Sequence, residues 1–170
     1  MTHGNAAMTD PNALLRHPAL GFLPRGVYLM TATCDAKRAG VLVESVQPCG
    51  GDPPLLAVSL RKGHWIEPLI RDSGCFAICL VDPGDRLVTR KFGDPLRPRE
   101  PGDPFDCFPL DRLTTGAPIL RRCTAALDCE VIRHIDIETE FAMYIARVVA
   151  SRVYKPSAQP KGQQPDSMSA

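Results

Sequence analysis

The stretch Asp52-Pro53-Pro54-Leu55-Leu56-Ala57-Val58-Ser59-Leu60 joins a sharp turn to an apolar run. The two consecutive prolines lack backbone N–H groups, so no regular element continues through them. The residues that follow contain neither glycine nor proline, and the run has the length of one strand. This stretch therefore predicts a β-strand that begins directly after a turn.

Runs of the same kind on both sides predict a chain built mainly of strands. The segments between the runs are polar or rich in glycine and proline, as turns are. Among them, Cys34–Ala39 is predicted as a polar hairpin turn. The six predicted strands are Gly26–Thr33, Gly40–Val46, Leu55–Leu60, Cys75–Val81, Cys123–Ile135 and Thr139–Tyr154. Hairpin-like separations favour a closed antiparallel barrel, because closure removes exposed strand edges.

Two short helices are predicted between the strands. Apolar residues recur at intervals of four in His64–Asp72, which is helical spacing. Pro68 interrupts this segment, so the helix is either bent or starts after His64. Gly74 has the residue type that commonly ends a helix. The second helix is predicted over Asp85–Phe92, and the proline-rich stretch 94–104 is predicted as an exposed excursion.

The composition is that of an ordinary globular domain. The chain has 170 residues, of which 44% are hydrophobic and 23% are charged. Its 20 basic and 19 acidic residues leave a net charge of +1, so no overall field favours nucleic acid or an anionic membrane. No apolar run reaches the ~20 residues of a membrane span, and no signal peptide is recognisable at the start.

The cysteine pattern argues against a metal site and for a reducing compartment. The seven cysteines are odd in number and contain no Cys-x-x-Cys pair, and the four histidines do not complete a ligand set. We therefore expect no metal and predict reduced cysteines that pack as small apolar side chains. These features predict a soluble, cytoplasmic protein.

The predicted organisation is one folded unit between two variable ends. Residues 1–19 form an N-terminal segment that is predicted to be partly mobile. Residues 20–154 contain all the predicted strands. Residues 155–170 combine three prolines with serine, glutamine and lysine, and are predicted as a disordered tail.

A series of short motifs then follows in a recognisable order along residues 20–153. The motifs are Leu20-Gly21-Phe22-Leu23-Pro24-Arg25-Gly26-Val27, Gly40–Val46, Asp52–Leu60, Ser73–Ile78, Lys91-Phe92-Gly93, Gly116-Ala117-Pro118-Ile119-Leu120, Leu127–Val131 and Ala146–Val149. In this order they resemble the flavin reductase-like family, whose members bind FMN in a split β-barrel. The resemblance implies a mainly β fold, namely a six-stranded antiparallel split barrel of Greek-key type with a few short helices.

The resemblance also implies which residues would hold the flavin. Residues at the end of the second predicted strand and in the loop after it would run along the cofactor, and those after the third would contact its phosphate. Arg61, Lys62 and Lys91 are the candidate phosphate cations. The first two lie where the predicted helix begins, and both a helix start and charge-assisted hydrogen bonds favour the binding of phosphate. The full set of cofactor-binding candidates is Glu44, Ser45, Val46, Gln47, Cys49, Ser59, Arg61, Lys62, Gly63, His64, Lys91 and Phe92.

Three positions depart from the family pattern. Leu42 and Glu44 stand where many members have hydroxyl residues, and a carboxylate close to a phosphate would oppose its binding. Glu44 must therefore point away, accept hydrogen bonds from the ribityl chain, or indicate a different binding mode. Phe141 occupies the position of a histidine near the nicotinamide in many family reductases, and it cannot donate a proton. No catalytic residue is assigned.

The resemblance implies an FMN-dependent oxidoreductase of the flavin reductase type, which takes hydride from NADH or NADPH. It also implies a homodimer and a monooxygenase as one class of electron-accepting partner. One alternative is an FMN-binding electron carrier without NAD(P)H turnover, which Phe141 favours. Another is a barrel without a cofactor, which Leu42 and Glu44 favour. The choices between NADH and NADPH, between FMN and FAD, and of the final acceptor stay open.

Overall fold

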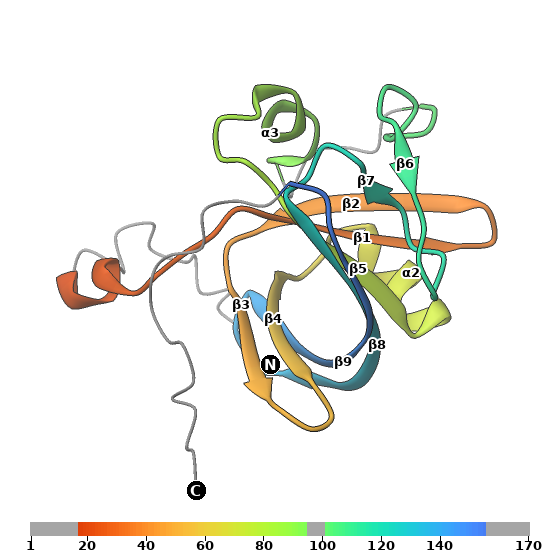
Figure 1. Cartoon of the computed structure of the whole chain (residues 1–170). Coiled ribbons are helices and arrows are strands. Elements are labelled where there is room, and N and C mark those ends of the chain that lie inside the picture. The colour runs from red at the N-terminus through yellow and green to blue at the C-terminus, as the bar shows by residue number, and fades with distance from the viewer. Residues whose placement is uncertain (1–16, 95–100, 156–170) are drawn as a thin grey trace, which may run out of the picture.

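The computed structural model describes residues 17–94 and 101–155. Most of the predicted N-terminal segment and tail, and part of the proline-rich excursion, lie outside these residues. In the described part, seven antiparallel strands form one curved sheet (Figure 1). Their order across the sheet is β2-β1-β5-β8-β9-β4-β3. The strands are β1 (Tyr28–Cys34), β2 (Lys37–Val43), β3 (Val46–Gly50), β4 (Leu55–Arg61), β5 (Cys75–Leu80), β8 (Ala125–Asp136) and β9 (Phe141–Val153).

The prediction of six strands in a closed barrel is not confirmed. The expected strand Gly40–Val46 ends at Val43, and after Glu44 and Ser45 the chain enters β3, a separate strand that pairs with β4. Strands β2 and β3 follow each other along the chain, yet they form the two opposite edges of the sheet. Within the described residues no hydrogen-bonded ladder joins these edges, so the sheet does not close into a barrel.

The first hairpin is tighter than predicted. The turn consists of Asp35 and Ala36, which have φ angles of 48° and 62°. Cys34 and Lys37 already pair across β1 and β2, so both strands extend into the segment Cys34–Ala39 that the polar residues mark as a turn. Two-residue turns with positive φ match the twist of the strands that they join, and this explains the longer ladder.

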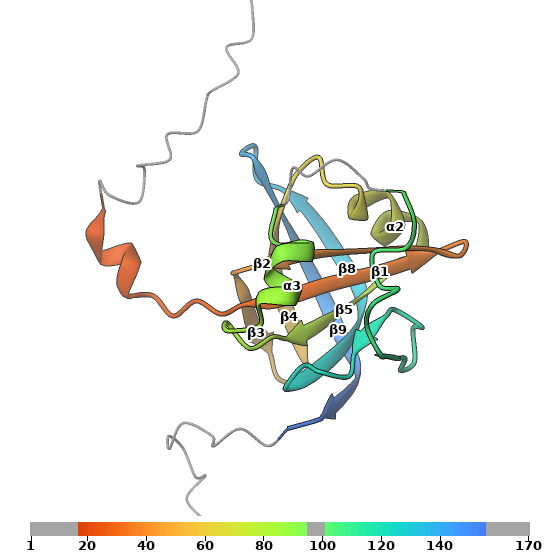
Figure 2. The ribbon, with the colours of Figure 1, turned by 90° about the horizontal axis from the view of Figure 1, so that it is seen from above.

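Two α-helices and a short 3-10 helix accompany the sheet. Helix α2 (Ile66–Ser73) starts two residues after His64, with Pro68 at its third position, and Gly74 caps it with a φ of 68°. Helix α3 (Arg86–Phe92) lies over β2 (Figure 2). The 3-10 helix η1 (Pro18–Phe22) extends away from the sheet (Figure 2). Two further short strands, β6 (Leu110–Asp111) and β7 (Ile119–Leu120), pair with each other.

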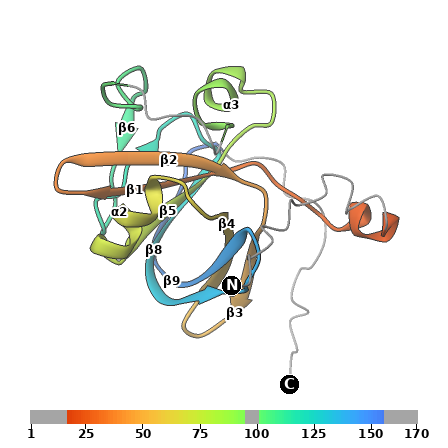
Figure 3. The ribbon, with the colours of Figure 1, turned by 180° about the vertical axis from the view of Figure 1, so that it is seen from behind.

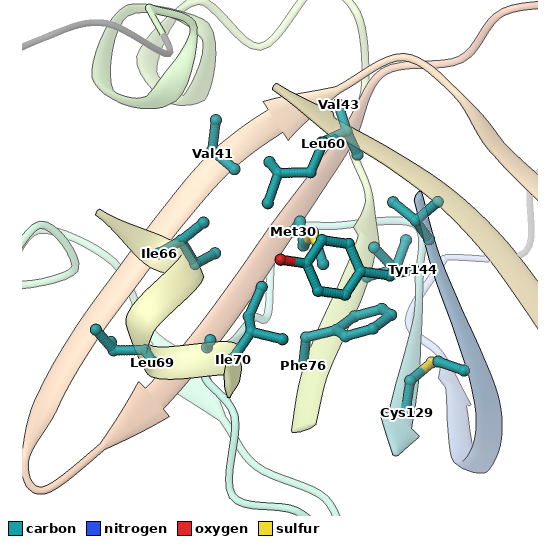
Figure 4. Packing of buried hydrophobic residues seen from close by; sticks show 14 of the residues in the cluster. Met30, Val41, Val43, Leu60, Ile66, Leu69, Ile70, Phe76, Cys129 and Tyr144 are labelled. Carbon is teal, nitrogen blue, oxygen red and sulfur yellow. The ribbon is translucent and has the colours of Figure 1, made fainter. Parts of the chain in front are cut away.

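The main core lies on the inner side of the curved sheet, where α2 packs against β1 and β2 (Figure 3). Its residues alternate along the strands, as in Leu56, Val58 and Leu60 of β4. Figure 4 shows the Tyr144 ring among these apolar side chains, above the ring of Phe76. The two rings meet edge to face, with centroids 6.4 Å apart.

A second core cluster covers the opposite side of β1 and β5. Met30 and Phe76 face the main core, whereas their neighbours Leu29 and Ala77 belong to this second cluster. Side chains of α3 and of residues 105–120 complete it. Both faces of β1 and β5 are therefore largely buried, and β5 reads as a continuous apolar run.

Candidate functional site

Strands β4 and β9 present their second face outside the main core. In β9, Ala142, Tyr144 and Ala146 are buried, whereas the residues between them are half-buried or exposed. Register places Arg61 opposite Phe141 and Ser59 opposite Met143. Directly opposed residues share a face, so these four side chains lie on one surface, which we call the outer face.

Three other predicted site residues border this outer face. Gln47 pairs with Ala57, so it lies on the same side as Ser59. The carbonyl oxygen of Ser45 accepts a hydrogen bond of 3.1 Å from the backbone N–H of Ser59. Val46 pairs with Val58 and packs against the main core, which leaves its backbone as the part that can meet a ligand.

Cys49 occupies an irregular position on the exposed edge strand β3. The register of β3 against β4 shifts between Pro48 and Gly50, so Cys49 is the extra residue of a bulge. Its thiol is free and its side chain is exposed. Because β3 is the last strand of the sheet, its outer edge has no strand partner within the described residues.

The two predicted phosphate cations at the end of β4 lie beside carboxylates of residues Asp136–Glu140, which we call the turn between β8 and β9. Arg61 Nη2 lies 3.7 Å from Glu140 Oε2, and Lys62 Nζ forms an ion pair with Asp136 Oδ1. The backbone N–H of Lys62 also donates to the Glu140 carbonyl oxygen at 2.8 Å. The hydrogen bond from Lys62 holds the pKa of the Asp136 carboxyl below its ordinary value.

Glu44 points toward a cation of its own chain. Its Oε2 atom lies 3.5 Å from Nη1 of Arg25, and both side chains are largely exposed. The contact offsets part of the negative charge that would oppose a phosphate. Each of the three explanations given for Glu44 stays a prediction.

The residues before α2 form hydrogen bonds with its first residues. Gly63 has a φ of 87°, which favours glycine, and its N–H donates to Glu67 Oε1 at 2.5 Å. The Nδ1 atom of buried His64 accepts a hydrogen bond of 3.0 Å from the N–H of Ile66. Burial lowers the pKa of His64 to about 4, so the ring is neutral near pH 7 and carries its proton on Nε2.

Lys91 and Phe92 lie on α3 and not on the outer face of β4 and β9. The Phe92 ring is only 3% exposed, and its centroid lies 5.2 Å from that of Phe105 and 5.7 Å from that of Phe108. Its side chain therefore serves the second core cluster. Asp85 begins this helix by accepting hydrogen bonds from the N–H groups of Leu87 and Val88.

Three charged residues of this region are absent from the predicted set of cofactor-binding residues: Arg25, Asp136 and Glu140. The acidic residues between the two last predicted strands are visible in the sequence, but their partners depend on how β9 pairs with β4. Within residues 17–94 and 101–155, no group of three or more His, Cys, Asp or Glu side chains could hold a metal ion. In the same residues, no helix has the length and apolarity to cross a membrane.

Comparison with known families identifies the motif series. Residues 20–162 match the family described as flavin reductase like domain, which covers the main sheet and both helices. One curated relative is FMN reductase (NADH) RutF from Bradyrhizobium diazoefficiens, which is 27% identical over 133 residues, or 78% of this chain and 71% of its own length.

A second relative is the stachydrine N-demethylase reductase subunit of Rhizobium meliloti. It is 31% identical over 147 residues, which cover 85% of this chain and 60% of that protein. The chain spans about a quarter of the length of a curated diflavin flavoprotein from Synechocystis that it also matches.

A solved structure supports the fold. The NADH:FAD oxidoreductase of Streptomyces globisporus superposes with a TM-score of 0.71 at 22% identity, over 88% of this chain and 89% of that chain. The likeness at this identity concerns the arrangement of strands and helices.

Proposed function

Because the chain belongs to the flavin reductase-like family, we propose that it is an NAD(P)H:flavin oxidoreductase that binds FMN at the outer face of β4 and β9. The observation that carries this proposal is the convergence of Ser59, Arg61 and Phe141 on one surface, next to the connection between β2 and β3. FAD is the alternative cofactor, because it has the same ring and first phosphate.

The donors at the end of β4 suit a phosphate group. Arg61 and Lys62 are adjacent in sequence, and their side chains are 39% and 31% exposed, so both can reach a ligand. Each charge-assisted hydrogen bond to a phosphate oxygen contributes about 1.5–3 kcal/mol. Lys91, the third cation predicted for the phosphate, lies on α3 away from this face, so the phosphate is assigned to Arg61 and Lys62.

Polar groups that fit the rest of a flavin lie nearby. The hydroxyls of Ser45 and Ser59 are assigned to the ribityl chain, and the Gln47 amide and the free edge of β3 to the polar edge of the ring. Bound flavin would supply the ring that accepts hydride. The protein would contribute position, hydrogen bonds and exclusion of water.

Phe141 is the candidate for the nicotinamide side of the site. Its side chain is 36% exposed on the outer face, opposite Arg61. An aromatic ring packs against a nicotinamide and shields it from water, but it donates no hydrogen bond. Hydride transfer requires no proton from the protein, so Phe141 is compatible with turnover.

We assign residues 20–154 to one flavin-binding domain whose curved sheet is a split barrel, with residues 1–19 and 155–170 as flanking segments.

A homodimer is supported by the apolar character of the outer face, where Met143, Ile145 and 42%-exposed Ile135 share the surface with Phe141. In η1, 90%-exposed Phe22 adds a second apolar surface for a partner copy.

The oligomeric state tests the proposed homodimer. Analytical ultracentrifugation should give a dimer for the wild type and a monomer for Ile135→Glu, because a charge in an apolar interface is strongly unfavourable. Val153→Glu, at the other end of β9, is the matched control and should remain dimeric. A monomeric wild type, or a fully dimeric Ile135→Glu variant, would reject this interface.

A monooxygenase is proposed as the partner that receives the electrons, since the protein named nitrilotriacetate monooxygenase component B from Mycobacterium thermoresistibile has a similar fold, with a TM-score of 0.71 at 22% identity. A cytoplasmic location is also proposed, because all seven cysteines are free thiols, as expected in a reducing compartment.

The decisive experiment begins with the visible absorption spectrum of the purified protein before and after FMN is added. It continues with NADH and NADPH oxidation at saturating FMN. Turnover well above background with either nucleotide supports the reductase. Bound flavin without turnover would support the electron carrier, and a protein that binds no flavin would refute both.

The phosphate assignment has its own test. Replacing Arg61 and Lys62 together by alanine should weaken FMN binding by two orders of magnitude or more, since two charge-assisted hydrogen bonds are lost, while riboflavin binding changes little. Arg71→Ala, an exposed cation on α2, is the control and should leave both affinities unchanged. An equal loss for both flavins would remove Arg61 and Lys62 from the phosphate site.

A further inference from the structure

We infer that Asp136 and Glu140 limit the affinity of the site for the flavin phosphate by occupying Arg61 and Lys62. This inference rests on the proposed function. It concerns two residues of the turn between β8 and β9 that are not among the predicted cofactor-binding residues but determine the affinity of the site.

The contacts of Lys62 show how the turn is held against the end of β4. Its ammonium group pairs with Asp136, and its backbone N–H donates to the Glu140 carbonyl oxygen at 2.8 Å. The Glu140 carboxylate in turn lies 3.7 Å from Arg61. Both cations are thus engaged from the same turn, which lies beside the end of β4 in Figure 3.

A hydrogen bond within the turn also holds one of these carboxylates in place. Asp136 Oδ1 also accepts a hydrogen bond of 2.8 Å from the N–H of Glu138, which has a positive φ of 55°. This arrangement fixes the Asp136 carboxylate beside Lys62. Glu140 directly precedes Phe141, the first residue of β9, so the pairing of β9 with β4 places it beside Arg61.

The consequence for an anionic ligand follows from charge. The formal charges of Arg61 and Lys62 are matched by those of Asp136 and Glu140, so the four groups together offer no net positive charge. A phosphate that approaches the two cations must separate them from the carboxylates and then remain close to two negative charges. Exposed ion pairs are weak, so the phosphate can displace them, but its affinity is reduced.

The test compares FMN with riboflavin, which lacks the phosphate. Asp136→Asn combined with Glu140→Gln removes both negative charges and keeps similar side-chain shapes. Glu138→Gln is the matched control, because it removes a charge from the same turn that forms no ion pair with Arg61 or Lys62. Dissociation constants are measured by flavin fluorescence at two salt concentrations, and urea unfolding verifies that each variant is folded.

The wild type should release FMN on gel filtration. The double variant should bind FMN on the order of tenfold more tightly, with a stronger dependence on salt, and riboflavin less than about twofold more tightly. The single variants Asp136→Asn and Glu140→Gln should each give part of the gain, which keeps the test valid if the double variant does not fold.

Two results would overturn the inference while the reductase proposal stands: FMN affinity that changes no more than in Glu138→Gln, or an equal change for riboflavin. Failure of the proposed function has a different signature, because then neither the wild type nor any variant binds either flavin.

Discussion

The two faces of strands β4 and β9 differ sharply in exposure, although successive residues of the same strands point to one face and then to the other. On the inner face, Leu56, Val58 and Leu60 are buried in the main core, at 4%, 0% and 1% exposure. On the outer face, Ala57, Ser59 and Arg61 are half-buried. The same backbone therefore carries one surface that stabilises the fold and another that remains available for a ligand or a second copy.

The two faces require different types of residue. The inner face admits apolar side chains of matched volume, because interiors are close-packed. The outer face combines hydroxyl, cationic and aromatic side chains, which a packed core would exclude without partners. Substitutions on the inner face should therefore change stability, and those on the outer face should change binding.

The largest expected effect compares one residue from each face. Leu60→Ala should lower the free energy of unfolding by about 2–5 kcal/mol, because it leaves a cavity in the main core. Met143→Ala, on the outer face, should lower it by less than about 1 kcal/mol in dilute solution. Urea denaturation measures both. Similar losses for the two variants would show that the outer face is part of the stabilising core of a single chain.

The next effect concerns buried His64, which lies between the end of β4 and the start of α2. Its pKa falls from about 6.5 in the unfolded chain to about 4 when folded, so the unfolded state binds more protons between these values. Stability is therefore complete above pH 6.5 and declines as the pH falls toward 4. The decline attributable to His64 is on the order of 3 kcal/mol.

His64→Gln tests this pH dependence, because glutamine does not titrate and its amide can still accept a hydrogen bond from Ile66. The free energy of unfolding is measured at pH 7 and pH 4.5 for both proteins. The variant should lose less stability on acidification than the wild type. A parallel decline in both proteins would assign the acid sensitivity to the carboxylates.

The smallest effect is expected for Ser59→Ala on the outer face. The unfolding free energy should change by less than about 0.5 kcal/mol, because the hydroxyl is half-buried and the strand pairing is untouched. FMN and riboflavin should both bind several-fold more weakly, since one neutral hydrogen bond contributes about 0.5–1.5 kcal/mol. A loss for FMN alone would move Ser59 from the ribityl chain to the phosphate.

The elements that local sequence features determine agree most closely with the structure. Apolar runs such as Cys75–Val81 predict strands because both faces are buried in the folded chain. Gly74 predicts the end of α2 because the left-handed conformation there suits glycine. The separate strand β3 escapes prediction, since Val46–Gly50 contains a proline and a glycine and becomes a strand only by pairing with β4.

The candidate site shows the same division. The resemblance to the flavin reductase-like family, the order of most strands, and the position of Arg61 and Lys62 shortly before a helix all follow from the residues alone. The pairing of these cations with Glu140 and Asp136, the contact of Glu44 with Arg25, and the burial of Phe92 depend on how distant strands meet.

The physical reason lies in register. In a sheet, a shift of one residue moves every side chain to the other face, and the bulges at Val149 of β9 and Ile132 of β8 change which residues of the two strands meet. Local preferences in the sequence form the strands, whereas the pairing of strands distant in the sequence selects the neighbours of each charge.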